Sequence, residues 1–564
     1  MKHRFLSLTF IACLLAGCTI TEDGVTEKDS YIYLGSTSSN FYLPTTYFED
    51  TKDVPYVSLN DFYGDIYSLL VKSSGLKNGG YSVSSGTITN KANNATMIFD
   101  VDSNTIYSDD YDQFVSTSSN SSDPYNMCSV SSDTLASYSD KSSYKKGSKI
   151  TFDLSKYNVK LFKHDNKVYV PFSFIEAIAT SFAPFHFSFN GDNFYLMDGS
   201  GIRDKNGNPT EYGTSYYSGS LNKSSTRSQS YADYNYNSFL FLMENFEGHF
   251  SRLGISSLDS KLDELGIKSK IASTDAETSS VGIAEAINRI FGDGGHTGFS
   301  SRGLGCSYNS EKDISLRQDI YNYDTRCVKS RETHNTLSAL RGKLTKNLEI
   351  SGETAIIRFD SFSLNDKDKS PTKADVENDT TSTFAIIYNS FNTIKQNSSI
   401  KNVVFDVSLN GGGALPAMAQ ALSFMTDDSI LLKVTNTLTG AVSTIAVDYD
   451  NNLDGNTKDN DSYAGKYNFY ILSSYDSFSC GNAFPIIAQE YGYARVIGET
   501  SGGGDCSITN TYGADGTSWV MSSDLSMTRK DGSNFDNGVT PDIELDSSYF
   551  YDAAKLDEKL SSLN

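Results

Sequence analysis

The sequence predicts an α/β fold for the C-terminal part of the chain, preceded by a helical segment and a β-rich region. Short apolar runs occur at residues 355–359, 403–407, 467–472 and 494–497, and helical patterns at residues 383–394, 414–425 and 483–491 lie between them. This alternation is typical of α/β units around a largely parallel sheet. Ligands of such sheets bind outside the carboxyl ends of the strands, so we expect the chemistry there.

Two regions precede this core. Residues 31–200 alternate Tyr-rich apolar runs with Ser, Asn and Gly turns, which predicts a β-rich accessory domain with a helix at residues 174–181. Residues 201–234 are rich in Ser, Tyr, Asn and Gly and are expected to form a linker. Apolar residues at helical spacing then predict a helical subdomain over residues 235–300. We expect a connecting segment at 301–350, the core at 351–548 and a C-terminal helix at 549–564.

The N-terminus has the pattern of an export signal. Lys2 and Arg4 precede an apolar run at residues 5–15 that is too short to cross a bilayer. The run ends in Leu-Ala-Gly-Cys at Cys18, which resembles the bacterial lipobox, whose cysteine is acylated. Residues 1–17 are therefore expected to be a lipoprotein signal peptide and residues 18–30 a tether. This implies a lipid-anchored protein of the bacterial cell envelope, periplasmic or surface-facing. An ordinary signal peptide with a chance cysteine is the alternative.

The composition bears on partners and cofactors. A formal charge of −22 and a pI near 4.7 argue against a nucleic-acid partner, which requires a basic face. The six histidines are scattered and none lies beside a CxxC pair, so neither a metal nor an organic cofactor is implied. An export compartment permits disulfides. Nearness in the sequence alone suggests the disulfide pairs Cys306 with Cys327 and Cys480 with Cys506, which would leave Cys128 unpaired.

Two segments at strand ends have residues suited to catalysis. The run from Val403 leads through Asp406 and Asn410 into the glycine triplet 411–413, where the backbone can approach a ligand and turn its N–H groups outward. A flexible turn is the alternative. Ser479 lies where the strand at 467–472 leads into a helix, so the helix N-terminus would stabilise negative charge beside its Oγ. A simple helix cap is the alternative there.

Together these segments resemble the tail-specific (C-terminal processing) serine protease family. Asp406, Asn410, Gly412 and Gly413 match its D-L-R-x-N-x-G-G motif, and Ser479 falls where its T-A-S-A-S-E nucleophile lies. Residues 496–500 are similar to its following strand and turn, and residues 538–543 to its closing G-V-x-P-D segment. The resemblance covers roughly residues 235–545. It implies a crotonase/ClpP-like peptidase core.

The resemblance also implies which base is used. The processing branch places a lysine 25 residues after its nucleophile, but Gly504 stands at that position, and there is no lysine between Ser479 and Arg529. The tricorn-core branch instead takes a histidine from an upstream D-x-H-T-like motif, which Asp293-Gly294-Gly295-His296-Thr297 resembles. A histidine of ordinary pKa can accept and return a proton near neutral pH. A polar loop residue is the alternative interpretation of His296.

The implied mechanism is acyl transfer to a polypeptide substrate. Ser479 attacks a peptide carbonyl, His296 takes the proton, and the backbone N–H groups of Gly412 and Cys480 hold the oxyanion. Tricorn-like enzymes orient the pair with a serine before the histidine and a glutamate before G-V-x-P-D. Here Gly295 replaces the serine, and Asp536 is the predicted orienting acid, with Asp293 as the alternative. No segment resembles the PDZ domain of many relatives.

Other functions remain open on the sequence. A lipoprotein that retains the peptidase fold but only binds a peptide or apolar ligand is the main alternative, as in the vertebrate retinoid-binding relatives of the superfamily. The missing serine before His296 and the shifted acid favour it. A purely structural surface lipoprotein would leave the ordered motifs unexplained.

Overall fold

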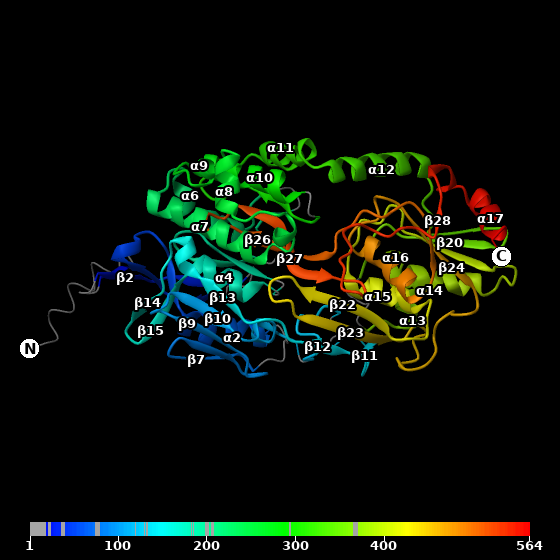
Figure 1. Cartoon of the computed structure of the whole chain (residues 1–564), viewed down its shortest axis with the longest axis horizontal. Coiled ribbons are helices and arrows are strands. Elements are labelled where there is room, and N and C mark those ends of the chain that lie inside the picture. The colour runs from blue at the N-terminus through cyan, green and yellow to red at the C-terminus, as the bar shows by residue number, and fades with distance from the viewer. Residues whose placement is uncertain are drawn as a thin grey trace, which may run out of the picture.

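The chain folds into two lobes that lie side by side in an elongated molecule (Figure 1). This computed structural model describes residues 18–20, 24–34, 40–73, 79–118, 120–128, 130, 134–181, 183, 185–197, 202–204, 208–292, 295–364 and 370–563. The expected signal peptide at residues 1–17 lies outside these ranges. Within them, no helix has both the length and the apolar character required to span a membrane.

The C-terminal lobe contains the predicted α/β core. Its six-stranded sheet has the order β19-β20-β21-β24-β25-β28, and every pair from β20 to β28 is parallel. The strands are β19 (Leu348–Ser351), β20 (Thr354–Arg358), β21 (Asn402–Asp406), β24 (Asn468–Ser473), β25 (Arg495–Gly498) and β28 (Ile543–Glu544). The helices are α13 (Lys373–Asn378), α14 (Thr383–Ile394), α15 (Leu415–Ser423), α16 (Cys480–Tyr491) and α17 (Ala553–Ser561). The predicted mixed α/β class and the alternation of elements from residue 354 are confirmed.

This sheet is covered on both faces, which explains its continuous apolar runs. Every residue of β20 and of β21 is buried. Because side chains alternate along a strand, Val403 and Phe405 enter the cluster built with α14, α15 and α16, whereas Val404 enters the cluster beneath α17. The carboxyl ends of β21 and β24 therefore lie side by side, in register from Asn402 with Asn468 to Asp406 with Leu472.

A second, seven-stranded sheet joins the two lobes. It has the order β11-β23-β22-β27-β18, with β12 paired to β23 and β26 to β27. Its strands are β11 (Ala136–Tyr138), β12 (Ser143–Lys145), β18 (Gly298–Ser301), β22 (Ile430–Asn436), β23 (Val442–Tyr449), β26 (Cys506–Tyr512) and β27 (Ser518–Met527). Figure 1 shows β26 and β27 crossing from the C-terminal lobe to the other, where Trp519 joins the N-terminal core.

The N-terminal lobe is rich in β-strands, as predicted. One sheet consists of β1 (Cys18–Ile20), β2 (Val25–Lys28), β5 (Thr45–Phe48), β6 (Tyr56–Ser58), β15 (Lys167–Pro171) and β14 (Phe162–His164). A second consists of β13 (Ile150–Asp153), β10 (Thr105–Ser108), β9 (Thr96–Asp100), β8 (Thr87–Asn90) and β7 (Tyr81–Ser84). A third consists of β16 (His186–Phe189), β17 (Phe194–Met197), β3 (Tyr31–Tyr33) and β4 (Asn40–Tyr42).

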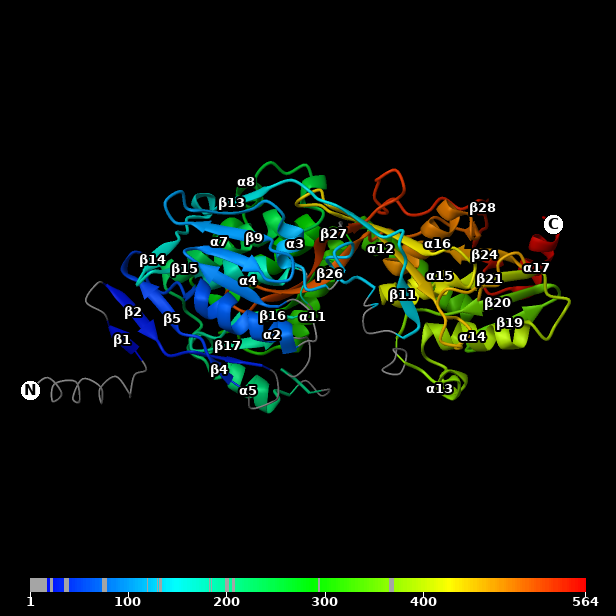
Figure 2. The same cartoon turned by 90° about the horizontal axis from the view of Figure 1, so that it is seen from below.

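Helices pack around these sheets and extend toward the C-terminal lobe (Figure 2). They are α2 (Ser68–Ser73), α3 (Tyr111–Val115), α4 (Phe172–Thr180), α5 (Glu211–Tyr217), α6 (Ser220–Lys223), α7 (Gln229–Phe246), α8 (Leu258–Glu264), α9 (Lys268–Ile271), α10 (Ala276–Ala286), α11 (Ser310–Gln318) and α12 (Thr325–Arg341). Shorter 3₁₀ or π turns are η1 (Glu49–Thr51), η2 (Asn60–Tyr67), η4 (Leu154–Tyr157), η5 (Phe250–Arg252), η6 (Ile287–Phe291), η8 (Asp319–Asn322) and η9 (Ser547–Tyr549). In Figure 1, α12 runs along the top from one lobe to the other.

Three expectations about connecting segments require correction. The tether at 18–30 contains β1 and β2, which pair with each other and extend a sheet. The linker at 201–234 contains α5, α6 and the start of α7, because tyrosines that resembled polar loop residues are buried: Tyr212 and Tyr216 pack on Tyr195. The accessory domain expected at residues 31–200 is not separate from the C-terminal part of the chain, since its strands β11 and β12 pair with β23.

The proposed disulfides are also absent from the structure, in which Cys128, Cys306, Cys327, Cys480 and Cys506 are not joined by disulfide bonds. Cys306 Sγ lies 3.4 Å from the Ala276 carbonyl oxygen, and Cys480 Sγ lies 3.2 Å from that of Gly413. Nearness in sequence did not correspond to nearness of these sulfur atoms in the fold.

A buried carboxyl pair between the lobes gives a test of this packing. Asp524 on β27 is 1% exposed, and neither carboxyl oxygen has a hydrogen-bond partner among the described residues. Burial and the nearby Asp112 carboxylate of α3 raise the pKa of Asp524 well above its ordinary value. The unfolded chain therefore releases this proton first as the pH rises above about 4, and each unit of pKa difference costs about 1.4 kcal/mol of folding free energy.

We predict that Asp524→Asn raises the thermal unfolding midpoint at pH 7.5 and that the gain shrinks at pH 4, near the ordinary pKa of aspartate, where the unfolded chain also holds part of the proton. Differential scanning fluorimetry at the two pH values measures this effect. The matched control is Asp428→Asn, because the Asp428 side chain is 77% exposed. A midpoint equal to or below that of the wild type at pH 7.5 would contradict the buried-proton interpretation.

Candidate functional site

Ser479 occupies a strained turn between β24 and α16. Its backbone angles are φ 57° and ψ −124°, a conformation that costs a non-glycine residue about 1–3 kcal/mol. The surrounding backbone holds the turn: the Ser479 N–H donates to the Gly503 carbonyl at 3.0 Å, and its own carbonyl accepts from Asn482 and Ala483. The side chain is partly exposed at the N-terminus of α16. The turn therefore presents Oγ beside the positive end of a helix.

The glycine loop after β21 packs directly on this turn. A Cβ atom on Gly412 would lie 2.6 Å from Ser479 Cβ and 2.9 Å from the Phe478 carbonyl oxygen, and Gly412 has φ 107°. The buried Asn410 braces the contact, because its side chain donates to the Phe359 carbonyl and its own carbonyl accepts from the Phe478 N–H, both at 3.0 Å. The structure thus brings the two motifs together, as the sequence led us to expect.

One of the two predicted oxyanion donors, the Gly412 N–H, already has a hydrogen-bond partner. The Gly412 N–H donates to Asn410 Oδ1 at 2.8 Å, so it is not available to a ligand. Among the described residues, the N–H groups of Gly413 and Cys480 make no hydrogen bond. Cys480 is the first residue of α16, where backbone N–H groups have no partner within the helix. The contact of Cys480 Sγ with the Gly413 carbonyl holds these two residues against each other.

His296 lies beside the serine turn, between η6 and β18. The centroid of its ring is 4.8 Å from that of Phe478, the residue before Ser479. Its backbone N–H donates to Ser522 Oγ at 3.1 Å. Its Nδ1 is buried without a partner, and within the described ranges its side chain makes no hydrogen bond to Ser479. Asp293, the alternative orienting acid, lies outside the described residues.

The electrostatics around His296 keep its ring neutral. Burial, followed by the positive charges of His249 and Arg326, lowers the pKa of His296 to about 4. At neutral pH the ring is therefore able to accept a proton, although it is a weaker base than a free imidazole.

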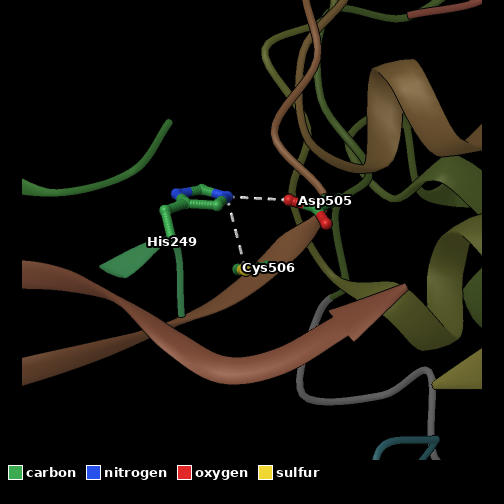
Figure 3. A group of neighbouring side chains, drawn as sticks. All are labelled: His249, Asp505 and Cys506. Atoms are coloured by element: carbon green, nitrogen blue, oxygen red, sulfur yellow. Dashed lines mark hydrogen bonds and ion pairs between the residues drawn. The ribbon is translucent and has the colours of Figure 1, made fainter. Parts of the chain in front are cut away.

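A second histidine, His249, is the centre of a buried charged network that the sequence did not reveal. It follows α7, and Figure 3 shows its ring pointing toward Asp505 and Cys506. Its Nε2–H donates to Asp505 Oδ1 at 2.9 Å, and the same nitrogen lies 3.3 Å from Asp536 Oδ2 and 3.5 Å from Cys506 Sγ. Arg252 also donates to both carboxylates. These bonds join the end of α7 to the segment before β26 and to residue 536.

The network holds fixed charges. Burial alone would lower the pKa of His249, but hydrogen bonds to Asp505 and Asp536 outweigh burial and raise it to about 12. Burial would likewise raise the pKa of Asp505, but hydrogen bonds from His249 and Arg252 hold it well below its usual range. His249 is therefore an imidazolium ion and Asp505 a carboxylate at neutral pH.

Asp536 is engaged differently from the prediction. Its carboxylate contacts His249 and Arg252, and its Oδ1 is buried without a partner. No hydrogen bond joins it to His296 within the part of the chain that the structure describes. This carboxylate is bound by the cationic side chains of His249 and Arg252, which lie in the turn after α7. The sequence placed them in an ordinary helical segment and gave no sign of their role.

The same turn also holds the segment that carries His296. Thr297 Oγ1 donates to Glu247 Oε1 at 3.0 Å and accepts from the Ser522 N–H at 2.9 Å. A Cβ on Gly295 would lie 3.2 Å from His249 Cε1, and Gly295 has φ 133°. Glycine rather than serine at position 295 thus fits the close approach of His249.

His249, Asp505 and Cys506 are also the residues most able to hold a metal, since one ligand atom of each lies within 4.8 Å of the others. The charges present argue for an ion-pair network instead. The His249 nitrogen that would bind a metal carries a proton for Asp505, and the Arg252 guanidinium occupies both carboxylates. Two cations facing two carboxylates neutralise each other without a further charge.

Comparisons with known proteins bear on the C-terminal lobe. Residues 353–545 match the model of peptidase family S41. No curated protein matches the chain. Among solved structures, the photosystem II D1 C-terminal processing protease is 18% identical with a TM-score of 0.27, over 36% of this chain and 47% of that one. The chain thus spans about half the length of that protein.

Two further solved structures are similar at the same level. A lipoprotein from Streptococcus agalactiae is 15% identical with a TM-score of 0.30, over 50% of this chain and 96% of that one. The tricorn protease is 16% identical with a TM-score of 0.23, over 44% of this chain and 20% of that one.

We predict that the His249 network makes stability depend on pH. A histidine whose pKa is raised by folding stabilises the folded state fully below about pH 6.5, and this contribution is lost as the pH rises toward 12. His249→Gln is expected to lower the free energy of unfolding by about 3 kcal/mol at pH 6, since it removes one of the two cations that face the carboxylates of Asp505 and Asp536, and by less at pH 9.5. Urea titrations at both pH values measure the difference.

The control is His334→Gln, because the His334 side chain is 55% exposed. It should change stability by less than about 1 kcal/mol at both pH values. A deficit of His249→Gln that stays constant from pH 6 to 9.5 would show that His249 is not charged in the folded protein.

Proposed function

We propose that this chain is a serine endopeptidase that cleaves exported proteins or peptides through an acyl-enzyme, because residues 353–545 match the model of peptidase family S41. The observation that carries the proposal is the strained turn of Ser479, pressed against Gly412 at the N-terminus of α16. A strained, partly exposed serine at a helix start is costly to maintain, and such strain is concentrated at functional sites.

The proposed reaction assigns a role to each nearby group. Ser479 Oγ attacks the peptide carbonyl carbon while His296 takes the hydroxyl proton. The oxyanion accepts hydrogen bonds from the N–H groups of Gly413 and Cys480, which have no partner in the described chain. Collapse breaks the C–N bond, and His296 returns the proton to the leaving amine. Water then hydrolyses the Ser479 ester by the same proton transfers.

His296 is favoured as the base by its position and its charge state. It contacts Phe478, next to the nucleophile, and its lowered pKa keeps it neutral in the pH range where peptidases act. Catalytic hydrogen bonds often tighten only when substrate binds, so the missing bond to Ser479 is compatible with this role.

The Ser-His assignment follows the tricorn-core branch within a crotonase/ClpP-like core. No lysine lies between Ser479 and Arg529 in the sequence. A Cβ on Gly504, where the processing branch has its lysine, would lie 2.6 Å from the Phe478 ring, so that space is filled. We therefore propose that the base comes from elsewhere in the chain, and His296 is favoured because its ring contacts Phe478, the residue before Ser479.

A second candidate is a lipoprotein that retains this fold and binds peptides or apolar ligands without cleaving them. Two observations favour it. His296 makes no hydrogen bond to Ser479 among the described residues, and the Asp536 carboxylate forms ion pairs with His249 and Arg252. The two candidates differ in whether Ser479 is a reactive nucleophile.

We predict that a fluorophosphonate probe labels the purified protein and that labelling is lost in Ser479→Ala and falls at least about a hundredfold in His296→Ala. The rate should rise with pH through about pH 4, where His296 loses its proton, and should be level from pH 6 to 8. Folded wild-type protein that stays unlabelled from pH 6 to 8 would support the binding candidate.

A glycine pair provides the matched control. A Cβ on Gly412 collides with Ser479, whereas a Cβ on Gly411 meets no atom within 4 Å. Gly412→Ala should therefore lower the labelling rate about a hundredfold, because a displacement of about 1 Å can have that effect, and Gly411→Ala should leave it near the wild-type value. Equal rates in the two variants would contradict the proposed geometry.

We also propose that the protein is exported and lipid-anchored through Cys18, on the basis of the charged start, the apolar run and the lipobox-like sequence at residues 1–18. When expressed in a bacterium with labelled palmitate, the wild type should incorporate label and partition with membranes. Cys18→Ser should do neither. Label that persists in Cys18→Ser would locate the lipid elsewhere or refute the anchor.

A further inference from the structure

The loop between β23 and β24 has the spacing of a calcium-binding loop. Residues 450–461 read Asp-Asn-Asn-Leu-Asp-Gly-Asn-Thr-Lys-Asp-Asn-Asp. In the twelve-residue calcium loop, oxygen ligands occupy positions 1, 3, 5 and 12, glycine occupies position 6, and position 7 supplies a main-chain carbonyl. Asp450, Asn452, Asp454, Gly455 and Asp461 fall at positions 1, 3, 5, 6 and 12. This ordered pattern is specific, unlike a mere excess of acidic residues.

The structure folds this segment around its first residue. The Asp450 side chain is 1% exposed, and its carboxylate accepts the N–H groups of Leu453 at 2.6 Å and Gly455 at 2.7 Å. Gly455 has φ 87°, the left-handed conformation that permits a sharp turn at position 6. The turn directs the side chains at positions 3 and 5 to the same side as residue 461.

Three of the ligand side chains meet. The Asn452 amide Nδ2 donates to Asp454 Oδ2 at 3.3 Å and also to Asp461 Oδ1. Asp461 Oδ2 accepts the Asn451 N–H at 3.2 Å, which brings position 12 back to the start of the loop. The Asn452 N–H₂ group thus bridges the carboxylates of Asp454 and Asp461.

The charges within the loop are not balanced by its own lysine. Lys458, at position 9, is directed outward, where its ammonium pairs with Asp448 and lies 3.4 Å from the Tyr138 carbonyl oxygen. The contacts that join Asn452 to Asp454 and Asp461 are therefore made without an ammonium group from the loop.

We propose that residues 450–461 bind one Ca²⁺ ion through side-chain oxygens of Asp450, Asn452, Asp454 and Asp461 and the carbonyl of Asn456. Rotation of the Asn452 amide replaces the bridging N–H₂ by Oδ1, and the cation takes over the contacts to both carboxylates. A ligand set of six or seven oxygens in a flexible loop suits Ca²⁺ better than Mg²⁺, which requires a tight octahedron. Asp461 is shorter than the usual glutamate, so we expect Kd of about 10⁻⁵–10⁻³ M, within the range of weaker sensors and extracellular modules.

The position of the loop gives the ion a structural role. Thr457 Oγ1 lies 2.5 Å from Ser137 Oγ of β11, and Asn451 bonds Ser423 at the end of α15. The loop therefore joins a strand from the N-terminal part of the chain to the C-terminal core. Bound Ca²⁺ should order this junction and stabilise the folded protein, whether or not the chain is a peptidase.

Isothermal titration of the purified, EGTA-treated protein with CaCl₂ tests this inference, together with its thermal midpoint in 5 mM CaCl₂ or MgCl₂. We expect one Ca²⁺ per chain, a higher midpoint with Ca²⁺ than with Mg²⁺, and at least tenfold weaker binding in Asp454→Asn. Asp454 is exposed, so this variant should fold. Asp461→Asn should weaken binding similarly.

The matched control is Asp459→Asn, an exposed carboxylate at position 10 of the same loop that is not a proposed ligand. It should weaken binding no more than about threefold, through its charge alone. Folded wild-type protein that binds no Ca²⁺ at 5 mM would overturn the proposal. Equal losses in Asp454→Asn and Asp459→Asn would do so as well, because they would indicate diffuse attraction by negative charge.

Discussion

The close approach of Gly412 to Ser479 is the contact on which the geometry of the C-terminal lobe depends. It requires β21 and β24 to be adjacent and parallel, so that the two loops leave the sheet at the same edge. It also requires glycine at position 412 and a serine that tolerates a positive φ. Asn410 braces both loops through three hydrogen bonds. The Asn410 side chain thereby accepts the Gly412 N–H, whereas the Gly413 N–H has no partner among the described residues.

The proposed base is positioned by the other lobe. His296 lies between η6 and β18, and the turn after α7 fixes its segment through Glu247 and Thr297. Ion pairs of His249 and Arg252 with Asp505 and Asp536 hold this segment after α7 in place. Assembly of the serine and the histidine therefore depends on the contact between lobes. Burial, followed by the charge of His249, lowers the pKa of His296. The lobes cannot be treated as independent units of function.

The sequence predicted the elements whose pattern is local. The strands β20, β21, β24 and β25 are buried on both faces and read as apolar runs, and the glycine triplet and Ser479 stand at their ends. The strands β22, β23, β26 and β27 were missed, because their burial depends on partners far along the chain. His249 was missed for the same reason: only the fold brings Asp505, more than two hundred residues away, to its ring.

The prediction for Asp536 had the right neighbourhood and the wrong partner. Sequence spacing placed an acid near the end of the core, but spacing does not tell which cation it meets, and Arg252 and His249 reach it from α7. The bond from the predicted oxyanion donor Gly412 to Asn410 was missed for a similar reason, since a side-chain acceptor two residues away cannot be inferred from a glycine triplet.

The measurement that tests the central claim most directly is a crystal structure of the protein with a peptide boronate, which forms a covalent adduct with a reactive serine. The account predicts boron bonded to Ser479 Oγ, one boronate oxygen within hydrogen-bond distance of the Gly413 and Cys480 N–H groups, and the His296 ring beside Oγ. A boronate bonded to another residue, or an adduct at Ser479 with a different base beside it, would contradict the proposed arrangement.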